Sequence, residues 1–327
     1  MTNFKYLNGF PADINEIRNR KEHVKKIVVE HPRYKYIRDT IEEIHLLSNG
    51  SVQADNLYLY GGTGVGKSTV LKEYASMFPR RLVDGQTKIP ILYFRVPVGA
   101  TPKSVASSML LAMKDPNYDK GTESNQTERI LHFVTMCEVE MVIIDEFQHL
   151  IDRETRHVLN RASDWVKKFS EDANIPIILA GMTESKIIFD HNEQLDRRFT
   201  EKKEMKGFKF STQDEQLEFR IFLNTIDEQL PFPHRANLAD INLAEKFFYV
   251  SNGNPYYVNK ILQEATVIAA KSGNDIIDQN HLYTAFNKLK ISKRPNISNP
   301  FKEENFNIGD AFAIEGRLNK NKTGNAS

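Results

Sequence analysis

Residues 57–69 read LYLYGGTGVGKST and contain the strongest structural signal in the chain. Its first four residues are apolar or aromatic and suit a buried strand; Gly61, four further residues, and Gly66, Lys67 and Ser68 follow. A loop that wraps phosphate groups must expose backbone N–H groups, and glycine lets the chain approach the anion in the required dihedral angles. The strand, the loop and the helix that starts here predict a P-loop for a nucleoside triphosphate.

The residues of this loop have distinct expected roles. Lys67 reaches the β- and γ-phosphates as a point charge, and Ser68 places its hydroxyl on Mg²⁺. The positive end of the following helix points at the anion. The expected nucleotide-binding residues are Gly61, Gly62, Thr63, Gly64, Val65, Gly66, Lys67, Ser68 and Thr69.

An acidic pair forms the second motif. Residues 141–144 are apolar and are followed by Asp145 and Glu146. Both carboxylates therefore lie at the C-terminal end of a buried strand, where open α/β sheets build their sites. We expect Asp145 to hold Mg²⁺ through water and Glu146 to polarise the attacking water. Two acids that merely begin a loop are the alternative, but the P-loop upstream favours a hydrolase.

Composition narrows the classes of function. The 327 residues are 40% hydrophobic, which allows a sizeable core and two domains. No apolar stretch is long enough to span a bilayer, and the start of the chain lacks a signal pattern, so we expect a cytoplasmic protein without a membrane partner. The single Cys137 excludes an internal disulfide. A net charge of +1 means that nucleic-acid binding needs locally concentrated positive charge.

Strands and helices alternate along the middle of the chain, which predicts an α/β fold with a five-stranded parallel sheet. The expected strands are 57–60, 89–96, 141–144, 175–180 and 205–210. The expected helices between them are 67–78, 102–114, 124–138, 153–173 and 183–190. Only helical periodicity follows, at 212–229, 240–251, 255–272 and 279–290.

We therefore expect four regions along the chain. An N-terminal arm and amphipathic helix (1–54) precede the P-loop core (55–211), and a small C-terminal helical lid (212–294) and a flexible tail (295–327) follow. The tail contains Phe301, Phe306 and Phe312. These aromatic residues suit the docking of a partner better than the holding of the fold.

A five-strand P-loop core with Asp-Glu after the third strand and a helical lid resembles the AAA+ ATPases. This resemblance implies further site residues. Thr183 matches by placement the sensor 1 residue after the fourth strand, although an N-cap of the next helix is the alternative. In residues 195–199, LDRRF, Arg198 resembles the arginine finger that reaches the γ-phosphate of the neighbouring subunit, with Arg197 as its support. Two solvated surface arginines are the alternative.

The lid departs from the family pattern at one position. Related initiator-type ATPases carry Gly-x-x-Arg there, whereas this chain has GNPY at residues 253–256. Tyr256 cannot supply the cation of the sensor 2 arginine. Either another basic residue such as Lys260 replaces it, or the lid helps less in holding the nucleotide.

Within the AAA+ proteins, the chain is similar to the TniB/TnsC group of transposition regulators. The similarity rests on the helix after His31 and Pro32, on residues 96–113, VPVGATPKSVASSMLLAM, and on residues 143–150, IIDEFQHL. It implies an ATP- and Mg²⁺-dependent protein of the bacterial cytosol or nucleoid that binds double-stranded DNA without sequence preference. It also implies a homo-oligomer, a ring or a helical filament, that links a TniQ/TnsD-like target selector to transposase subunits.

The resemblance also points to DNA contacts near the start of the helix after the second strand. Thr101, Lys103 and Ser104 lie there, and hydroxyl groups and lysines at a helix N-terminus suit phosphate. A plain N-cap and a solvated lysine are the alternative. Three other functions remain open, namely a small-molecule P-loop kinase, an initiator or helicase loader, and a scaffold that uses ATP only to set assembly.

Overall fold

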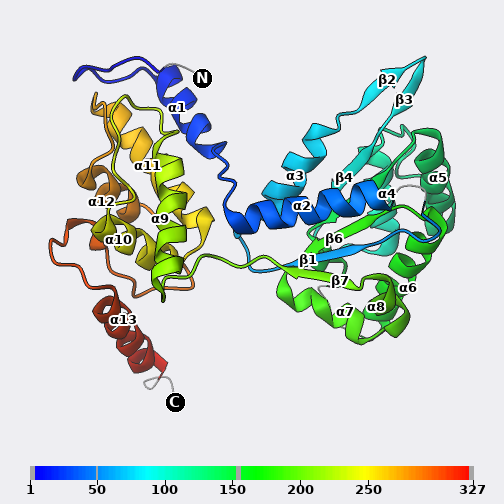
Figure 1. Cartoon of the computed structure of the whole chain (residues 1–327). Coiled ribbons are helices and arrows are strands. Elements are labelled where there is room, and N and C mark those ends of the chain that lie inside the picture. Colours follow the sequence, from blue (N-terminus) through cyan, green and yellow to red (C-terminus); the bar gives the residue numbers. More distant parts are fainter. Residues whose placement is uncertain (1–3, 49–50, 152–155, 324–327) are drawn as a thin grey trace. The chain divides into compact units, whose positions relative to one another are not determined.

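The computed structural model describes residues 4–48, 51–151 and 156–323, with the backbone alone described at Arg156 and residues 320–323. Contacts divide the chain into two compact units, Pro32–Lys206 and a unit that joins Met1–His31 to Gly207–Ser327 (Figure 1). The predicted region 1–54 is therefore split, because its first part belongs with the C-terminal helices. Each unit is described by itself below.

A five-stranded sheet forms the centre of the first unit (Figure 1), and its strand order is β4-β5-β6-β1-β7. Its strands are β1 (Leu57–Tyr60), β4 (Ile91–Arg95), β5 (Met141–Asp145), β6 (Ile177–Gly181) and β7 (Glu201–Glu204). All neighbouring strands are parallel, as predicted. Every residue of β1, β5 and β6 is buried, which fits a parallel sheet covered on both faces.

The fifth strand differs from the predicted range 205–210. β7 has the sequence EKKE and no apolar residue, so hydrophobic periodicity could not reveal it. It lies at the edge of the sheet with β1 as its neighbour, and charged residues are a common feature of edge strands. The observed strand therefore ends at Glu204, immediately before the predicted strand begins.

Helices surround the sheet of this unit. They are α2 (Pro32–Leu47), α3 (Lys67–Met77), α4 (Pro102–Ala112), α5 (Glu123–Met136), α6 (Arg156–Ala173), α7 (Ile187–Asp190) and α8 (Glu193–Arg198). The first residues of the predicted helix 153–173 lie outside the described residues. The predicted helix 183–190 is a 3₁₀ turn, η2 (Thr183–Lys186), followed by α7. A second 3₁₀ turn, η1 (Phe147–Leu150), follows β5.

A short hairpin of β2 (Arg81–Val83) and β3 (Gln86–Lys88) was not predicted. Its two turn residues, Asp84 and Gly85, have φ angles of 49° and 78°. Positive φ at both central positions matches the right-handed twist of a two-residue hairpin. The Asp-Gly pair was therefore a local signal for this turn.

The second unit is helical. It contains α1 (Ile14–Lys25), α9 (Gln213–Asp227), α10 (Ile241–Ser251), α11 (Pro255–Lys271), α12 (Gln279–Asn287), η3 (Pro300–Lys302) and α13 (Ile308–Thr323). α1 packs against α11, so the segment predicted as an N-terminal arm is part of this unit. Arg20 of α1 is fully buried, donates to the carbonyl oxygen of Lys5 at 2.7 Å and lies over the ring of Phe232.

The region predicted as a flexible tail also packs into this unit. Phe301 is fully buried and Phe306 is buried, and both belong to the apolar core of the helical unit. Arg294 pairs with Glu315 of α13 at 2.6 Å. The prediction that these phenylalanines serve a partner is therefore wrong for Phe301 and Phe306, because their rings fill the core. Among the described residues, no helix combines the length and apolar character that crossing a membrane requires.

Candidate active site

The glycine-rich loop lies between β1 and α3, and the backbone of Met205, directly after β7, packs against it. Gly61 has φ 154°, and a Cβ at this position would lie 2.1 Å from the carbonyl oxygen of Met205. Met205 follows β7 and donates its N–H to the carbonyl oxygen of Tyr60 at 2.7 Å. Gly66, with φ 110°, caps the N-terminus of α3. Only glycine fits at Gly61, so the loop backbone is held close against its neighbour without a side chain between them.

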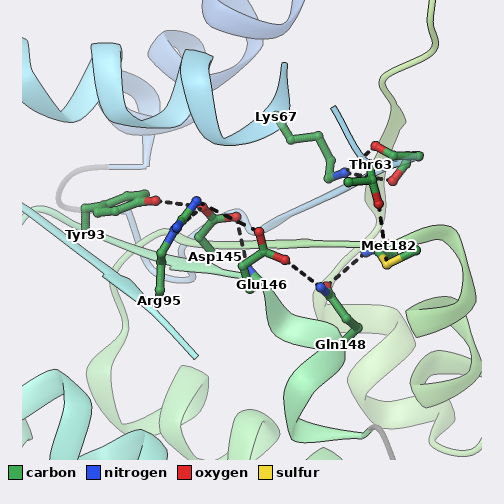
Figure 2. Close-up of polar contacts among 10 residues, drawn as sticks. Thr63, Lys67, Tyr93, Arg95, Asp145, Glu146, Gln148 and Met182 are labelled. Atoms are coloured by element: carbon green, nitrogen blue, oxygen red, sulfur yellow. Dashed lines mark hydrogen bonds and ion pairs between the residues drawn. The ribbon is translucent and has the colours of Figure 1, made fainter. Parts of the chain in front are cut away.

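Lys67 folds back over this loop. Its Nζ donates to the carbonyl oxygens of Gly61 at 2.7 Å and Gly62 at 2.9 Å (Figure 2). Burial lowers the pKa of Lys67, and the negative charges of Glu146 and Asp145 act against this shift. The loop thus holds a partly buried ammonium group within electrostatic reach of the acidic pair.

Asp145 ends β5 and is 1% exposed. Its Oδ2 accepts a hydrogen bond of 2.6 Å from the Tyr93 hydroxyl and lies 3.5 Å from Nε of Arg95. Burial raises the pKa of Tyr93, and the hydrogen bond to Asp145 raises it further, so the hydroxyl stays a donor. The parallel register places Arg95 opposite Asp145, where β4 and β5 end.

Glu146 takes a left-handed backbone conformation, with φ 59° and ψ 38°. Its Oε1 lies 3.9 Å from Nη2 of Arg95, and its Oε2 accepts a hydrogen bond of 2.5 Å from Nε2 of Gln148. Oε1 of Gln148 in turn accepts the N–H of Met182 at 3.1 Å. Figure 2 shows this row of contacts between the ends of β4, β5 and β6.

The other predicted residues of this edge lie nearby. Ser68 is partly buried in the first turn of α3. Oγ1 of Thr63 lies 4.0 Å from Sδ of Met182, which brings the P-loop to the end of β6. Thr183 is the next residue and is exposed. The N-cap of η2 is Met182, so the alternative reading of Thr183 as an N-cap is wrong.

Arg198 lies at the opposite edge of the sheet. The Asn56 side chain, just before β1, accepts the N–H of Ile177 at 2.8 Å and donates to the carbonyl oxygen of Arg198 at 3.1 Å. Because β1 and β6 both begin here, Arg198 lies at the amino edge, whereas the P-loop leaves the carboxyl edge. Four residues of strand separate these edges by about 13 Å.

The two arginines of this motif have different surroundings. Nε and Nη2 of Arg198 lie 3.1 and 2.9 Å from Oε1 of Glu171, and its side chain is 26% exposed. The side chain of Arg197 is 81% exposed, 3.9 Å from a carboxyl oxygen of Glu193. The reading of two solvated surface arginines therefore describes Arg197 and not Arg198.

The residues predicted to contact DNA begin α4. Thr101 and Ser104 form a capping box, in which each side chain accepts the other residue's N–H at 3.3 and 2.8 Å. The alternative reading of Thr101 as an N-cap is thus correct. Lys103 lies in the same turn and is exposed.

The GNPY segment is a turn between two helices. Gly253 has φ 71°, and a Cβ there would lie 2.1 Å from the carbonyl oxygen of Phe208. Asn254 caps α11 by accepting the N–H of Tyr256 at 3.0 Å, and Pro255 occupies the first turn. Tyr256 is 55% exposed. Local packing accounts for the Gly, Asn and Pro of this segment.

Sequence reasoning missed several supporting residues. They are Tyr93, Arg95, Gln148, Glu171 and Met205. Arg95 is the second-last residue of the predicted strand 89–96, and a parallel sheet brings strand ends to one edge, so its approach to the acidic pair had a signal. Gln148 follows the acidic pair by two residues, but its bond to the end of β6 had no local signal.

Comparison with known proteins agrees with this architecture. Residues 21–209, more than half of the chain, match the family described as "Bacterial TniB protein". No curated protein matches the chain.

Several solved structures share the fold. The Aeropyrum pernix ORC1 protein in complex with DNA has a TM-score of 0.59 at 16% identity, over 82% of this chain and 69% of that chain. Cdc6p from Pyrobaculum aerophilum has a TM-score of 0.60 at 11% identity, over 88% and 75%. The ADPNP–ADP complexes of Aeropyrum pernix ORC2 give 0.57 at 12%, over 87% and 70%. The parallel sheet with its flanking helices and the C-terminal helices thus has the AAA+ fold of these proteins.

Proposed function

The chain belongs to the TniB family, and we propose that it is an ATP- and Mg²⁺-dependent ATPase that assembles on double-stranded DNA to regulate transposition. One observation carries this proposal most directly. The P-loop lies at the carboxyl edge of the sheet and contains Lys67. The acidic pair, Asp145 and Glu146, lies at the same edge. This is where α/β proteins place the phosphates of a nucleotide.

The residues of this edge fit ATP with Mg²⁺. The close approach of Met205 to Gly61 fixes the loop backbone, and the N-terminus of α3 adds its positive end. Lys67, which now donates to two loop carbonyls, supplies the cation for the phosphates. Ser68 and the buried Asp145 would hold Mg²⁺, which neutralises charge on the phosphates when bound.

Glu146 is the candidate for polarising the attacking water. Its carboxylate is approached by Arg95 and accepts a hydrogen bond from Gln148, whereas the Asp145 carboxylate accepts one from Tyr93. These different partners suit a division of work in which Asp145 serves the metal and Glu146 serves the water. Thr183, which is exposed and follows Met182, is the candidate for contacting the γ-phosphate or the water.

Arg198 would act on the nucleotide of a neighbouring copy. It lies at the amino edge of the sheet, about 13 Å of strand away from the protomer's own P-loop. A guanidinium keeps its charge and stabilises negative charge that develops on the phosphates during transfer. The proposed site is therefore complete only where two subunits meet, and hydrolysis depends on oligomerisation.

Binding of DNA and of the transposition machinery is the furthest part of this proposal. The net charge of +1 leaves no global attraction, so affinity would come from a few cations repeated along the oligomer. Lys103 is the candidate contact, because it is exposed while Thr101 and Ser104 are engaged in the capping box. A transposase and a TniQ/TnsD-like selector would be the partners of this assembly.

A duplex-binding assay tests the proposal. Fluorescence anisotropy of labelled duplexes of unrelated sequence should rise only with ATP or a slowly hydrolysed analogue, and should fall steeply with salt. Lys67→Ala should abolish the rise because it removes the phosphate contact, whereas Lys103→Glu should weaken it without changing ATP binding. A full-length protein that binds no DNA with ATP at low salt would contradict the proposal. If the protein hydrolyses ATP but does not bind DNA, it is an ATPase with a function other than the one proposed.

A further inference from the structure

The Gln148 side chain lies between the acidic pair after β5 and the end of β6. Its Nε2 donates to Oε2 of Glu146 at 2.5 Å, and its Oε1 accepts the N–H of Met182 at 3.1 Å. A carboxylate only accepts and a backbone N–H only donates, so the side-chain amide has a single orientation that satisfies both. The amide is therefore a fixed bridge from the acidic pair to the end of β6 (Figure 2).

The base of this bridge is rigid. Gln148 lies in η1, whose flanking residues Phe147 and Leu150 are 0% and 1% exposed in the apolar core. The carbonyl oxygen of His149 accepts the N–H of Ala100 at 3.0 Å, which ties η1 to the loop before α4. A side chain that starts from such an anchored turn has few other positions to adopt.

The end of β6 is shaped to admit the amide. A Cβ at Gly181 would lie 2.6 Å from Oγ of Ser185 and 3.2 Å from Oε1 of Gln148. Beyond Gly181, Met182 meets Thr63 of the P-loop and leads into Thr183. A shift of this strand end would therefore change the contact of Met182 with the P-loop on one side and its hydrogen bond with Gln148 on the other.

We infer that Gln148 is a positioning residue that holds the Glu146 carboxylate in register with the end of β6. This inference rests on the proposed role of Glu146 in hydrolysis. Glu146 has a left-handed backbone and a partly exposed side chain, so its carboxylate depends on partners for its place. Arg95 supplies charge at 3.9 Å, and Gln148 supplies the direct hydrogen bond. A shift of the carboxylate by about 1 Å is enough to slow the reaction on the order of a hundredfold.

Steady-state hydrolysis and nucleotide binding of the full-length protein, with ATP and duplex DNA, test this role. Gln148→Leu should lower kcat on the order of tenfold to a hundredfold. KM and the Kd of an ATP analogue should stay close to those of the wild type, because the P-loop is unchanged. In the Glu146→Gln background, Gln148→Leu should cause no further loss, since the group it positions is already altered. An equal extra loss in both backgrounds, or a parallel rise in Kd, would overturn the inference.

The backbone half of the bridge has its own probe. Met182 has φ −75°, which proline accepts, so Met182→Pro removes the N–H that Gln148 binds with little change of backbone shape. Met182→Ala loses the side chain but keeps the N–H and is the reference. We expect kcat to fall further in Met182→Pro than in Met182→Ala, and the gap to close when Gln148→Leu is added. Equal rates for the two variants would refute the bridge, whereas full activity of Glu146→Gln would refute the proposed role of Glu146 in hydrolysis.

Discussion

The carboxyl and amino ends of the strands in the central sheet differ in how their charged side chains are held. At the carboxyl edge, Asp145 is buried, Glu146 has two partners, and Lys67 lies in a braced loop. At the amino edge, Arg198 is partly exposed and is held by the single carboxylate of Glu171. In the proposed function, the connected side chains at the carboxyl edge bind the nucleotide, and Arg198 at the amino edge completes a neighbour's site. That proposal requires assembly, and not closure within one protomer, to create the full site.

The largest effect is expected at the carboxyl edge. Glu146→Gln removes the charge that polarises water and should lower kcat by about 10²- to 10⁴-fold while ATP binding persists. Radiolabelled ATP hydrolysis and equilibrium binding measure the two quantities. Glu193→Gln is a control, since Glu193 is exposed and lies away from this edge. Loss of binding equal to the loss of rate would mean that Glu146 supports the fold of the site and not the chemical step.

A slightly smaller effect is expected at the amino edge. Arg198→Ala removes one charged donor and should lower hydrolysis by about 10²- to 10³-fold in the assembled protein. Arg197→Ala is a matched control, because the neighbouring side chain is 81% exposed and should change the rate little. Equal losses in both variants would show that the motif works through surface charge and would remove the distinction between the two residues.

The contact that holds Arg198 should matter less than Arg198 itself. Glu171→Gln leaves a weaker hydrogen-bond acceptor and frees the guanidinium to move, so hydrolysis should fall by no more than about fivefold. The loss should shrink at high salt, where the ion pair is already screened. A faster rate than wild type would instead mean that Glu171 restrains the arginine before assembly.

The smallest effect concerns the charge of Lys67 in the free protein. Burial lowers its folded pKa below the ordinary value of 10.5, so folding penalises the charged form. Stability relative to a non-titrating Lys67→Met variant should therefore increase as the pH rises through the interval between the lowered pKa and 10.5. Thermal unfolding at several alkaline pH values measures this difference. A difference that stays constant across the interval would show that the lysine is not perturbed.

The fold and the main motifs could be predicted because their signals are local. The P-loop and the acidic pair each combine a buried strand with a short polar stretch, and the sheet follows from alternating elements. β7 could not be predicted because an edge strand of charged residues has no apolar pattern. The brace from Met205 to Gly61 and the bond from Gln148 to Met182 join residues that are distant in sequence, and no periodicity reveals such contacts.

The helical unit shows the same limit at larger scale. The N-terminal segment looked like an arm because it is polar, yet Arg20 of α1 is buried against Phe232. The C-terminal segment looked like a tail because turn residues separate its aromatic side chains. Phe301 nevertheless packs against Phe247 of α10, with ring centroids 5.3 Å apart. Segments with few apolar residues, such as these two, are held in the unit by tertiary contacts, and composition does not predict such contacts.

In the proposed assembly, one copy supplies the acidic pair and another copy supplies Arg198. Mixing Arg198→Ala with Glu146→Gln protein tests it directly, because some interfaces then join an intact Glu146 to an intact Arg198. We expect ATP hydrolysis by the mixture to exceed clearly the sum of the separate variants, with a maximum near equal proportions. If the rate never exceeds that sum while labelled subunits demonstrably co-assemble, Arg198 does not act across the interface.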